Sequence, residues 1–197
     1  MHTPLTVIVL MATLLALTVP GVSAEAVVLK RALSTDSFAG ENLLPNAGFE
    51  QAGPDGVVGW TPWEAGYEVD DAEKRGGQRS VRCTGDDPDI EYGIGYTVQL
   101  NQQAPAPIAA TCWSKAETVS GSPESNYSLY LDLEFMDGTP LWGQTAHFDC
   151  GTHDWQKRTV TVVPPKPIRS VIVHGIFRRK TGAVWFDDFS LFSQDLP

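Results

Sequence analysis

Residues 127–135 read YSLYLDLEF, and their pattern gives the first indication of the architecture. Apolar residues stand at every second position from Tyr127 to Phe135, and Ser, Tyr, Asp and Glu fill the positions between them. Alternation with a period of two is typical of a β-strand that buries one face and exposes the other. The stretch is followed by Asp137-Gly138, a dipeptide that favours a turn. It is therefore predicted to be a half-buried strand that ends at a turn.

Strand-like segments of this kind occupy most of the chain. They are RSVRCT (79–84), GYTVQLN (95–101), IAATCWSKA (108–116), QTAHFDC (144–150), WQKRTVTVV (155–163), RSVIVHGIF (169–177) and AVWFDDFSLF (183–192). Sequences rich in turn-forming residues, such as GDDPD and VPPKP, separate them. No long window carries the i, i+3, i+4 stripe of an amphipathic helix, and 18 Gly and 14 Pro disfavour long helices. Many short strands at regular spacing predict an all-β protein built as an antiparallel β-sandwich.

The N-terminal region has the pattern of a secretion signal. The apolar run LTVIVLMATLLALTVP is followed by the small residues Val22-Ser23-Ala24, so residues 1–24 are predicted to be a signal peptide. A membrane anchor that stays attached is the alternative. Residues 25–41 form a lead-in segment, and residues 42–197 are long enough for one domain with a full core. We expect a secreted protein, extracellular or periplasmic, with no membrane segment after cleavage.

Charge and cysteine content narrow the function classes. The net charge of −10 and the pI of about 4.7 argue against nucleic acid as a partner, because its phosphates repel an acidic protein. Secretion allows a disulfide among Cys83, Cys112 and Cys150, but the odd count leaves at least one thiol unpaired. The pairing stays open. The lack of a CxxC pair argues against a zinc site.

A series of short blocks resembles a known group of proteins. The order is NLLPNAGFE (42–50), GGQRSVRCTG, GIGYTVQL, IAATCWSKAE, THDWQKRTVTVVPP and GAVWFDDFSLF (182–192). This series resembles the carbohydrate-binding modules of families four, nine and twenty-two, which are secreted, galactose-binding-like jelly rolls usually attached to glycoside hydrolases. The resemblance implies a jelly-roll sandwich, a polysaccharide or glycan as ligand, and a place for a catalytic domain in a larger parent protein.

The same resemblance implies a structural calcium ion between the first and last strands. The ligands implied are the side chains of Glu50 and Asp187 and carbonyl groups near Arg75 and Gly76. In VWFDDFSLF, Asp187 has the same parity as Trp185 and Phe189, so it is expected on a buried face, where a carboxylate needs a partner or a metal. Asp188 has the opposite parity and is expected to point away. The alternative is that Glu50 and Asp187 pair with Arg or backbone N–H groups and bind no metal.

Outward-pointing aromatic residues indicate where a sugar would bind. Flat rings stack on sugar C–H surfaces, and exposed aromatic clusters usually mark binding surfaces. Tyr130 lies on the polar side of its strand, and Trp113 points outward if Cys112 faces the core. We expect one outer, concave face to bind the ligand through Trp113, Tyr130, Gln99, Asp132 and His174, with Trp142 in a loop that lines one end of it. Trp63, Tyr67 and Tyr92 are expected in loops at one end, and Trp60, Trp155 and Trp185 in the core.

Catalysis is not expected. Asp132 and Glu134 share a strand face at a spacing of about 7 Å, which suits a glycosidase pair, so spacing alone does not exclude them. The chain has no GxSxG, HExxH or P-loop motif, however, and DDPDIEY reads as an acidic surface loop. The remaining alternative is a protein-interaction or cell-surface structural module with the same fold. Exposure of Trp113 and Tyr130 distinguishes the two, because a sugar-binding face needs its rings in water.

Overall fold

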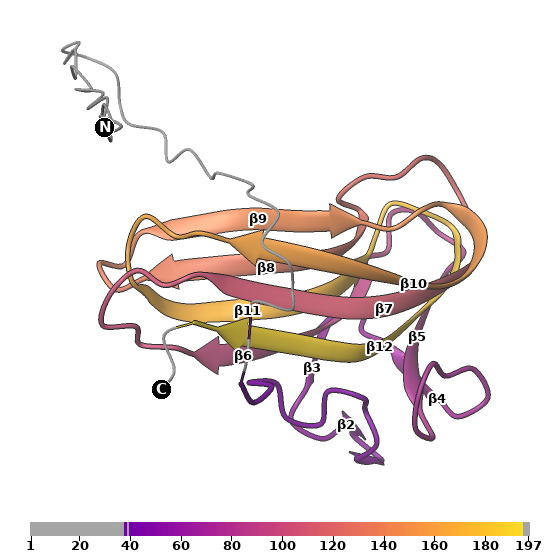
Figure 1. Ribbon diagram of the computed structural model, residues 1–197. Helices are drawn as coiled ribbons and strands as arrows, with labels where there is room; N and C mark the ends of the chain where they lie inside the picture. Colours follow the sequence, from indigo (N-terminus) through magenta and orange to yellow (C-terminus); the bar gives the residue numbers. More distant parts are fainter. Residues whose placement is uncertain (1–37, 39, 195–197) are drawn as a thin grey trace, which may run out of the picture.

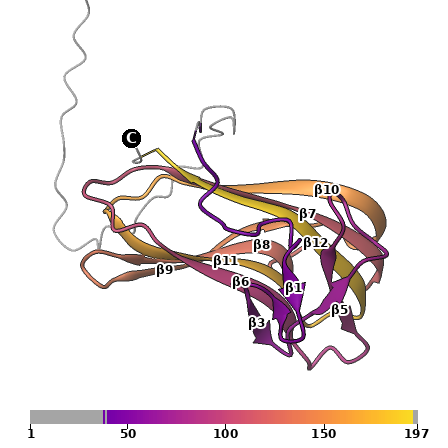
Figure 2. The same cartoon turned by 90° about the horizontal axis from the view of Figure 1, so that it is seen from below.

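Two five-stranded antiparallel sheets make up the computed structural model, which describes residue 38 and residues 40–194 (Figure 1). One sheet, called here the β7 sheet, has the order β10 (Gly151–Val162), β7 (Ile108–Val119), β12 (Gly182–Ser193), β5 (Ser80–Gly85) and β4 (Glu68–Asp70). The other, the β8 sheet, has the order β3 (Thr61–Glu64), β6 (Tyr92–Gln99), β11 (Ile168–Phe177), β8 (Tyr127–Phe135) and β9 (Pro140–His147). A small hairpin pairs β1 (Ala52–Gly53) with β2 (Gly56–Val57). The two sheets form the layers of a sandwich (Figure 2), which confirms the predicted fold class.

Every segment predicted as a strand from its alternation is one, but the first strand that the resemblance implied at residues 42–50 is not. Residues 127–135 match β8 at both ends, and the other predicted segments match β5 to β12 within a few residues. The sequence did not predict β1 to β4, because two to four residues are too few to reveal an alternation. The predicted signal peptide (1–24) and almost all of the lead-in segment (25–41) lie outside the described residues. In the described part of the chain, no helix has the length and apolarity needed to cross a membrane.

The core lies between the sheets and follows the predicted alternation. Leu129, Leu131 and Leu133 of β8 are fully buried, as is Cys112 of β7. The three cysteines are all free thiols, so no disulfide joins them in this structure. Burial raises the pKa of the Cys112 thiol, because the thiolate loses its hydration there.

The two ends of the domain lie side by side, as predicted. The Leu43 N–H donates to the Leu191 carbonyl, and the Phe189 N–H donates to the Ala47 carbonyl, each at 2.9 Å. The Asn42 amide oxygen accepts from the Leu191 N–H at 2.9 Å. Residues 42–50 form turns rather than a strand, so this segment attaches to β12 without extending the sheet.

A β-bulge in β12 overturns one parity prediction. Val184 and Phe186 belong to the core, whereas Asp187 lies opposite Trp113 on the outer side of the β7 sheet. The register then shifts between Asp187 and Ser190, with Asp188 at a φ of 48°. The prediction that Asp187 shares the core face with Phe189 is therefore wrong, because the extra residue reverses the alternation. Asp187 is nevertheless fully buried, under the backbone of residues 75 and 76.

Candidate functional site

Strand register places four of the predicted ligand contacts on the outer side of the β8 sheet. His174 of β11 lies opposite Tyr130 on one side and Gly95 on the other. The same pairing sets Ile172 opposite Asp132 and Ser170 opposite Gln99. Because directly paired residues point to the same side of a sheet, Tyr130, Asp132, His174 and Gln99 share this side. We call it the aromatic face.

Three rings form the centre of the aromatic face. The His174 ring lies edge-on to Tyr130 at a centroid distance of 6.1 Å and to Trp63 of β3 at 6.5 Å. Two glycines of β6 make room for them. A Cβ at position 95 would lie 2.7 Å from His174 Nδ1, and one at position 93 would lie 3.2 Å from Trp63 Cε3. Trp63, expected in a loop, is therefore part of the face.

His174 is a neutral group in the middle of these rings. Only 7% of its surface is exposed, and burial lowers the pKa of its imidazole to about 4. Its Nδ1 has no hydrogen-bond partner among the described residues. The ring therefore acts as an uncharged aromatic surface above a pH of about 5.

Polar groups and a further tryptophan extend the face toward the edge strand β9. Asp132 Oδ1 accepts a hydrogen bond from the Gly143 N–H at 2.9 Å. Burial, followed by the nearby Asp132 charge, raises the pKa of Tyr130, so this phenol stays protonated. Next to Gly143, the side chain of Trp142 is 60% exposed. The face thus has partly buried rings at its centre, and the neighbouring edge strand β9 carries an exposed tryptophan where the β8–β9 register shifts.

Trp113 does not join this face, and the prediction that it does is wrong. It belongs to β7, so its side chain lies on the outer side of the opposite sheet. The Arg75 guanidinium covers its ring, with Cζ 4.1 Å from the ring centroid. Parity tells the side of a strand but not the sheet to which the strand belongs. Here the consecutive strands β7 and β8 belong to different sheets.

The other tryptophans expected in the core differ in outcome. Trp60 is buried in the core cluster, as predicted. Trp185 is buried but lies outside that cluster, where its Nε1 donates to Asp70 Oδ2 at 2.8 Å. Trp155 is only partly buried, so its assignment to the core is wrong. It falls where the β10–β7 register shifts, and this irregularity breaks the alternation on which the prediction depends.

The predicted calcium ligands surround the backbone of residues 75–79. Asp187 Oδ2 accepts from the N–H groups of Arg75 at 2.9 Å and Gly76 at 3.1 Å. Glu50 Oε2 accepts from the Gln78 N–H at 2.9 Å. Arg75 and Gly76 therefore present N–H groups to Asp187 here, which are the contacts of the metal-free alternative.

Asp188 is closer to this group than its parity suggested. An ideal Cβ on Gly48 would lie 3.3 Å from Asp188 Oδ1, 3.9 Å from Asp187 Oδ1 and 4.0 Å from Glu50 Oε1. The bulge thus brings a third carboxylate beside the two predicted ones. Burial, and then the Asp188 charge, raise the pKa of Asp187 to about 6.

The chemistry of these groups fits a hard cation, since calcium prefers several carboxylate oxygens. Their spacing in this structure is set by backbone N–H donors, and no three Asp, Glu, His or Cys side chains of the described residues form a closed metal-binding group. Calcium accordingly stays a prediction.

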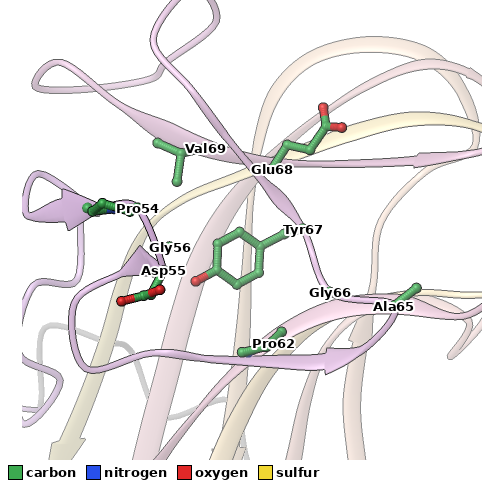
Figure 3. A pocket seen from close by; sticks show the side chains of 10 residues that line it. Pro54, Asp55, Gly56, Pro62, Ala65, Gly66, Tyr67, Glu68 and Val69 are labelled. Carbon is green, nitrogen blue, oxygen red and sulfur yellow. The ribbon is translucent and has the colours of Figure 1, made fainter.

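A separate hollow lies beside the β1–β2 hairpin (Figure 3). Its volume is about 500 Å³, and its lining includes Pro54, Pro62, Tyr67 and Glu68. The Tyr67 hydroxyl accepts a hydrogen bond from the Val57 N–H at 3.0 Å. Pro62 and Trp63 are successive residues of a strand, so the hollow and the aromatic face lie on opposite sides of β3. Tyr67 therefore lines the hollow and not the sugar-binding candidate, and Tyr92 packs against the core.

One residue of the aromatic face was missed by the sequence analysis. Arg178 follows β11 directly, and its Cζ lies 5.8 Å from the ring centroids of both Trp63 and Tyr130. A signal was present, because Arg178 has the same parity as His174 in the run that begins at residue 169. The alternation of apolar residues stops at Phe177, so the predicted strand ends one residue before Arg178.

Comparison with solved structures identifies the fold. The CBM22-1 xylan-binding domain of Paenibacillus barcinonensis Xyn10C matches with a TM-score of 0.58 and 16% identity, over 81% of this chain and 99% of that domain. TmCBM61 in complex with beta-1,4-galactotriose matches with a TM-score of 0.54 and 17% identity, over 79% of this chain and 100% of that one. The arabinose-bound α-L-arabinofuranosidase MgGH51 gives 0.56 and 17%, over 77% of this chain and 26% of the enzyme. The chain therefore has the jelly-roll sandwich fold of carbohydrate-binding modules, as the resemblance implied.

Sequence comparison gives a partial match of another kind. No family model matches the chain. The tRNA nuclease WapA of Bacillus subtilis (strain 168) is 36% identical over 105 residues, which are 51% of this chain and 4% of that protein. The tRNA3(Ser)-specific nuclease WapA of Bacillus spizizenii is 36% identical over 104 residues, with the same coverage. The chain thus matches a small part of much longer relatives.

Proposed function

We propose that this protein is a secreted, non-catalytic carbohydrate-binding module that recognises a polysaccharide or glycan on the aromatic face. The observation that carries the proposal is the group of Trp63, Tyr130 and His174 on the outer side of the β8 sheet, with ring centroids 6.1 and 6.5 Å apart. A buried core does not explain these rings, because they lie on the side of the sheet that faces away from it. The jelly-roll fold supports the same function at the level of architecture.

Binding would combine stacking with hydrogen bonds. The rings of Trp63 and Tyr130 offer apolar surface to sugar C–H groups, and the exposed Trp142 extends this surface toward β9. Gln99 is exposed, and Asp132 is partly exposed with one carboxylate oxygen bonded to the Gly143 N–H, so both side chains can meet sugar hydroxyl groups. His174 holds the rings apart and adds a neutral surface.

Catalysis is not part of the proposal. The two carboxylates that share a strand on this face already have partners, since Asp132 accepts from the Gly143 N–H and Glu134 pairs with Arg169 at 3.0 Å. A glycosidase needs one of the pair as a proton donor with a raised pKa. Both carboxylates are instead engaged as acceptors, one by a backbone N–H and the other by a guanidinium group.

The experiment is retention on a panel of soluble and insoluble polysaccharides, measured by affinity electrophoresis and pull-down. Tyr130→Ala and Trp142→Ala should each weaken binding about tenfold or more, the cost of losing an aromatic contact of roughly 1.4 kcal/mol. Trp155→Ala, on the β7 sheet, is the matched control and should bind like the unchanged protein. Equal losses in all three variants, or no binding to any member of the panel, would contradict the proposal.

A structural calcium ion is the second element of the proposal. Glu50 and Asp187 would hold it, with Asp188 as a third carboxylate, and it would fix residues 42–50 and 75–79 to the middle of β12. It would supply stability and take no part in sugar binding, because these residues lie on the β7 sheet side. Removal with EDTA should lower the melting temperature and leave saturated glycan binding unchanged.

The partial match to the much longer WapA nucleases favours one alternative, a protein-interaction or structural module within a long parent protein. The match concerns a region that is 4% of the relative's length, so it gives no ground for carrying the nuclease activity named for that protein over to this chain. The acidic charge of −10 also makes RNA a poor ligand. Absence of glycan binding together with specific binding to a protein partner would support this alternative.

A further inference from the structure

Arg178 is placed at one end of the aromatic face and reaches over its rings. Its N–H donates to the Asn126 carbonyl at 2.8 Å, which continues the β11–β8 ladder by one step beyond Phe177 and Tyr127. From there the side chain extends back along the face, so that Cζ lies 5.8 Å from the centroids of both Trp63 and Tyr130. Both distances are within the range of cation–π attraction.

The guanidinium group of Arg178 is only partly used by the protein. Its Nε donates to Asn126 Oδ1 at 2.9 Å, and no described residue accepts a hydrogen bond from its terminal nitrogens. Arg75, Arg158, Arg169 and Arg179 each have a carboxylate oxygen within 4.0 Å, whereas no ion pair of this kind forms at Arg178 or, away from the aromatic face, at Arg79 and Arg82 among the described residues. Arg178 is thus a fixed cation on the proposed binding surface, with donors left over and no acidic partner among the described residues.

A positive and a negative side chain lie at opposite ends of the aromatic face. Arg178 lies at the end next to Trp63, Tyr130 lies between, and Asp132 lies beyond Tyr130 along β8. A neutral sugar offers the guanidinium group only hydroxyl and ether oxygens as acceptors. Guanidinium groups with free terminal nitrogens match planar carboxylates best, through two parallel hydrogen bonds.

We propose that the glycan recognised on this face carries a carboxylate, as in a uronic acid residue, and that Arg178 is the residue that selects it. This inference rests on the proposed glycan-binding function and adds the class of sugar. Trp63 and Tyr130 would stack on the ring of the acidic residue, while Arg178 binds its carboxylate. Asp132, at the other end, would accept from neutral hydroxyls and repel a second acid, so the charged sugar has a defined position.

The test uses pairs of ligands that differ only in charge. Glucuronoxylan, polygalacturonate and alginate are each compared with their carboxyl-reduced forms by isothermal titration calorimetry, with dextran sulfate and dextran as a further pair. At least one acidic polysaccharide should bind about tenfold or more tightly than its reduced form, as expected for a charged hydrogen bond of roughly 1.5–3 kcal/mol. The preference should shrink as NaCl rises from 20 to 500 mM.

Variants then assign the preference to one residue. Arg178→Gln should bind the acidic ligand only as well as the native protein binds the reduced form. Arg179→Gln changes the net charge equally and removes the exposed neighbour, which pairs with Glu91, so it should keep the full preference. Arg178→Lys keeps the charge without the planar fork and should retain part of it. Melting temperatures of all three variants show whether any loss reflects unfolding.

Each result decides between the claims. Binding to a neutral polysaccharide with no gain from a carboxylate overturns this inference and leaves the glycan-binding function standing. Binding to dextran sulfate but to no carboxylated polymer overturns the uronic acid assignment. A protein that binds no member of either panel fails both proposals. Equal preference in Arg178→Gln and the native protein overturns the role of Arg178.

Discussion

Tyr130 and His174 lie directly opposite each other across β8 and β11, with ring centroids 6.1 Å apart and ring planes at 74°. On its other side His174 lies opposite Gly95, where the missing side chain leaves room for the imidazole. The aromatic face therefore depends on a position that carries no side chain at all. Several consequences of this arrangement can be measured.

Gly95→Ala should disturb the face directly. The new Cβ would lie 2.7 Å from His174 Nδ1, so the ring must move away from β6. We expect a loss of unfolding free energy of about 1–3 kcal/mol and weaker glycan retention, because crowding a packed site forces side chains out of their preferred rotamers. Urea denaturation and affinity electrophoresis measure the two effects. Gly53→Ala is the control, since a Cβ there meets nothing within 4 Å, and a similar loss in both variants would argue against the mechanism.

His174 should make the protein less stable in acid. Its pKa is lowered to about 4 in the folded protein, below the ordinary value of 6.5, so the unfolded chain binds more protons between these values. The contribution of His174 to stability should fall as the pH drops from about 6.5 to 4, whereas glycan binding should stay level from pH 5 to 8. Chemical denaturation at several pH values tests this. In His174→Phe the slope over this range should be smaller, and an unchanged slope would refute the assignment.

Asp187 should have the opposite effect when no cation is present. Its pKa is raised to about 6 from 3.8, so the folded protein binds more protons between these values and loses stability as the pH rises from about 4 to 6. If calcium binds there, its stabilising effect should grow over the same range, reaching about 2.7 kcal/mol at a hundred times its Kd. Melting curves with CaCl2 or EDTA at pH 4.5 and 7.5 provide the measurement. A calcium effect that is equal at both values, or that survives in Asp187→Asn, would count against this site.

Trp113→Ala should separate the two sheets functionally. The Arg75 guanidinium lies 4.1 Å from the Trp113 ring centroid, and both are remote from the aromatic face because β7 belongs to the other sheet. We expect a stability loss of at least the 0.5–1 kcal/mol of an exposed cation–π contact, with glycan affinity unchanged. Calorimetric titration beside Tyr130→Ala makes the comparison. A similar fall in affinity for both variants would contradict the assignment of the ligand to the β8 sheet alone.

The sequence predicted most of the fold because alternation is a local signal. Tyr127 to Phe135 form β8 with the predicted inward and outward sets, and Tyr130, Asp132 and His174 reach one face for that reason. The failures come from features that alternation does not contain. A single extra residue after Asp187 reverses the parity of β12, and nothing in FDDF indicates where such a bulge falls.

The candidate site was less predictable than the fold, for a topological reason. Trp113 points outward as expected, but the pairing of β7 with β10 and β12 places it on the other sheet. Sheet membership depends on contacts between distant parts of the chain, and a single sequence does not specify them locally. Arg178 was missed because a charged residue after a strand normally belongs to a turn. Here its backbone continues the pairing of β11, and its side chain extends back over the rings of the aromatic face.

The hydrogen bond between Leu43 and Leu191 means that the polypeptide enters and leaves this domain through neighbouring backbone positions. A domain built in this way can be inserted into a surface loop of a larger protein with little distortion of the domain or of its host, because the two ends of the domain lie close together. Host segments joined at both ends would meet at one corner of the sandwich. The domain would then be attached to its host at one point only. It could reorient about that point, so that the outer side of the β8 sheet contacts an extended polymer along its length.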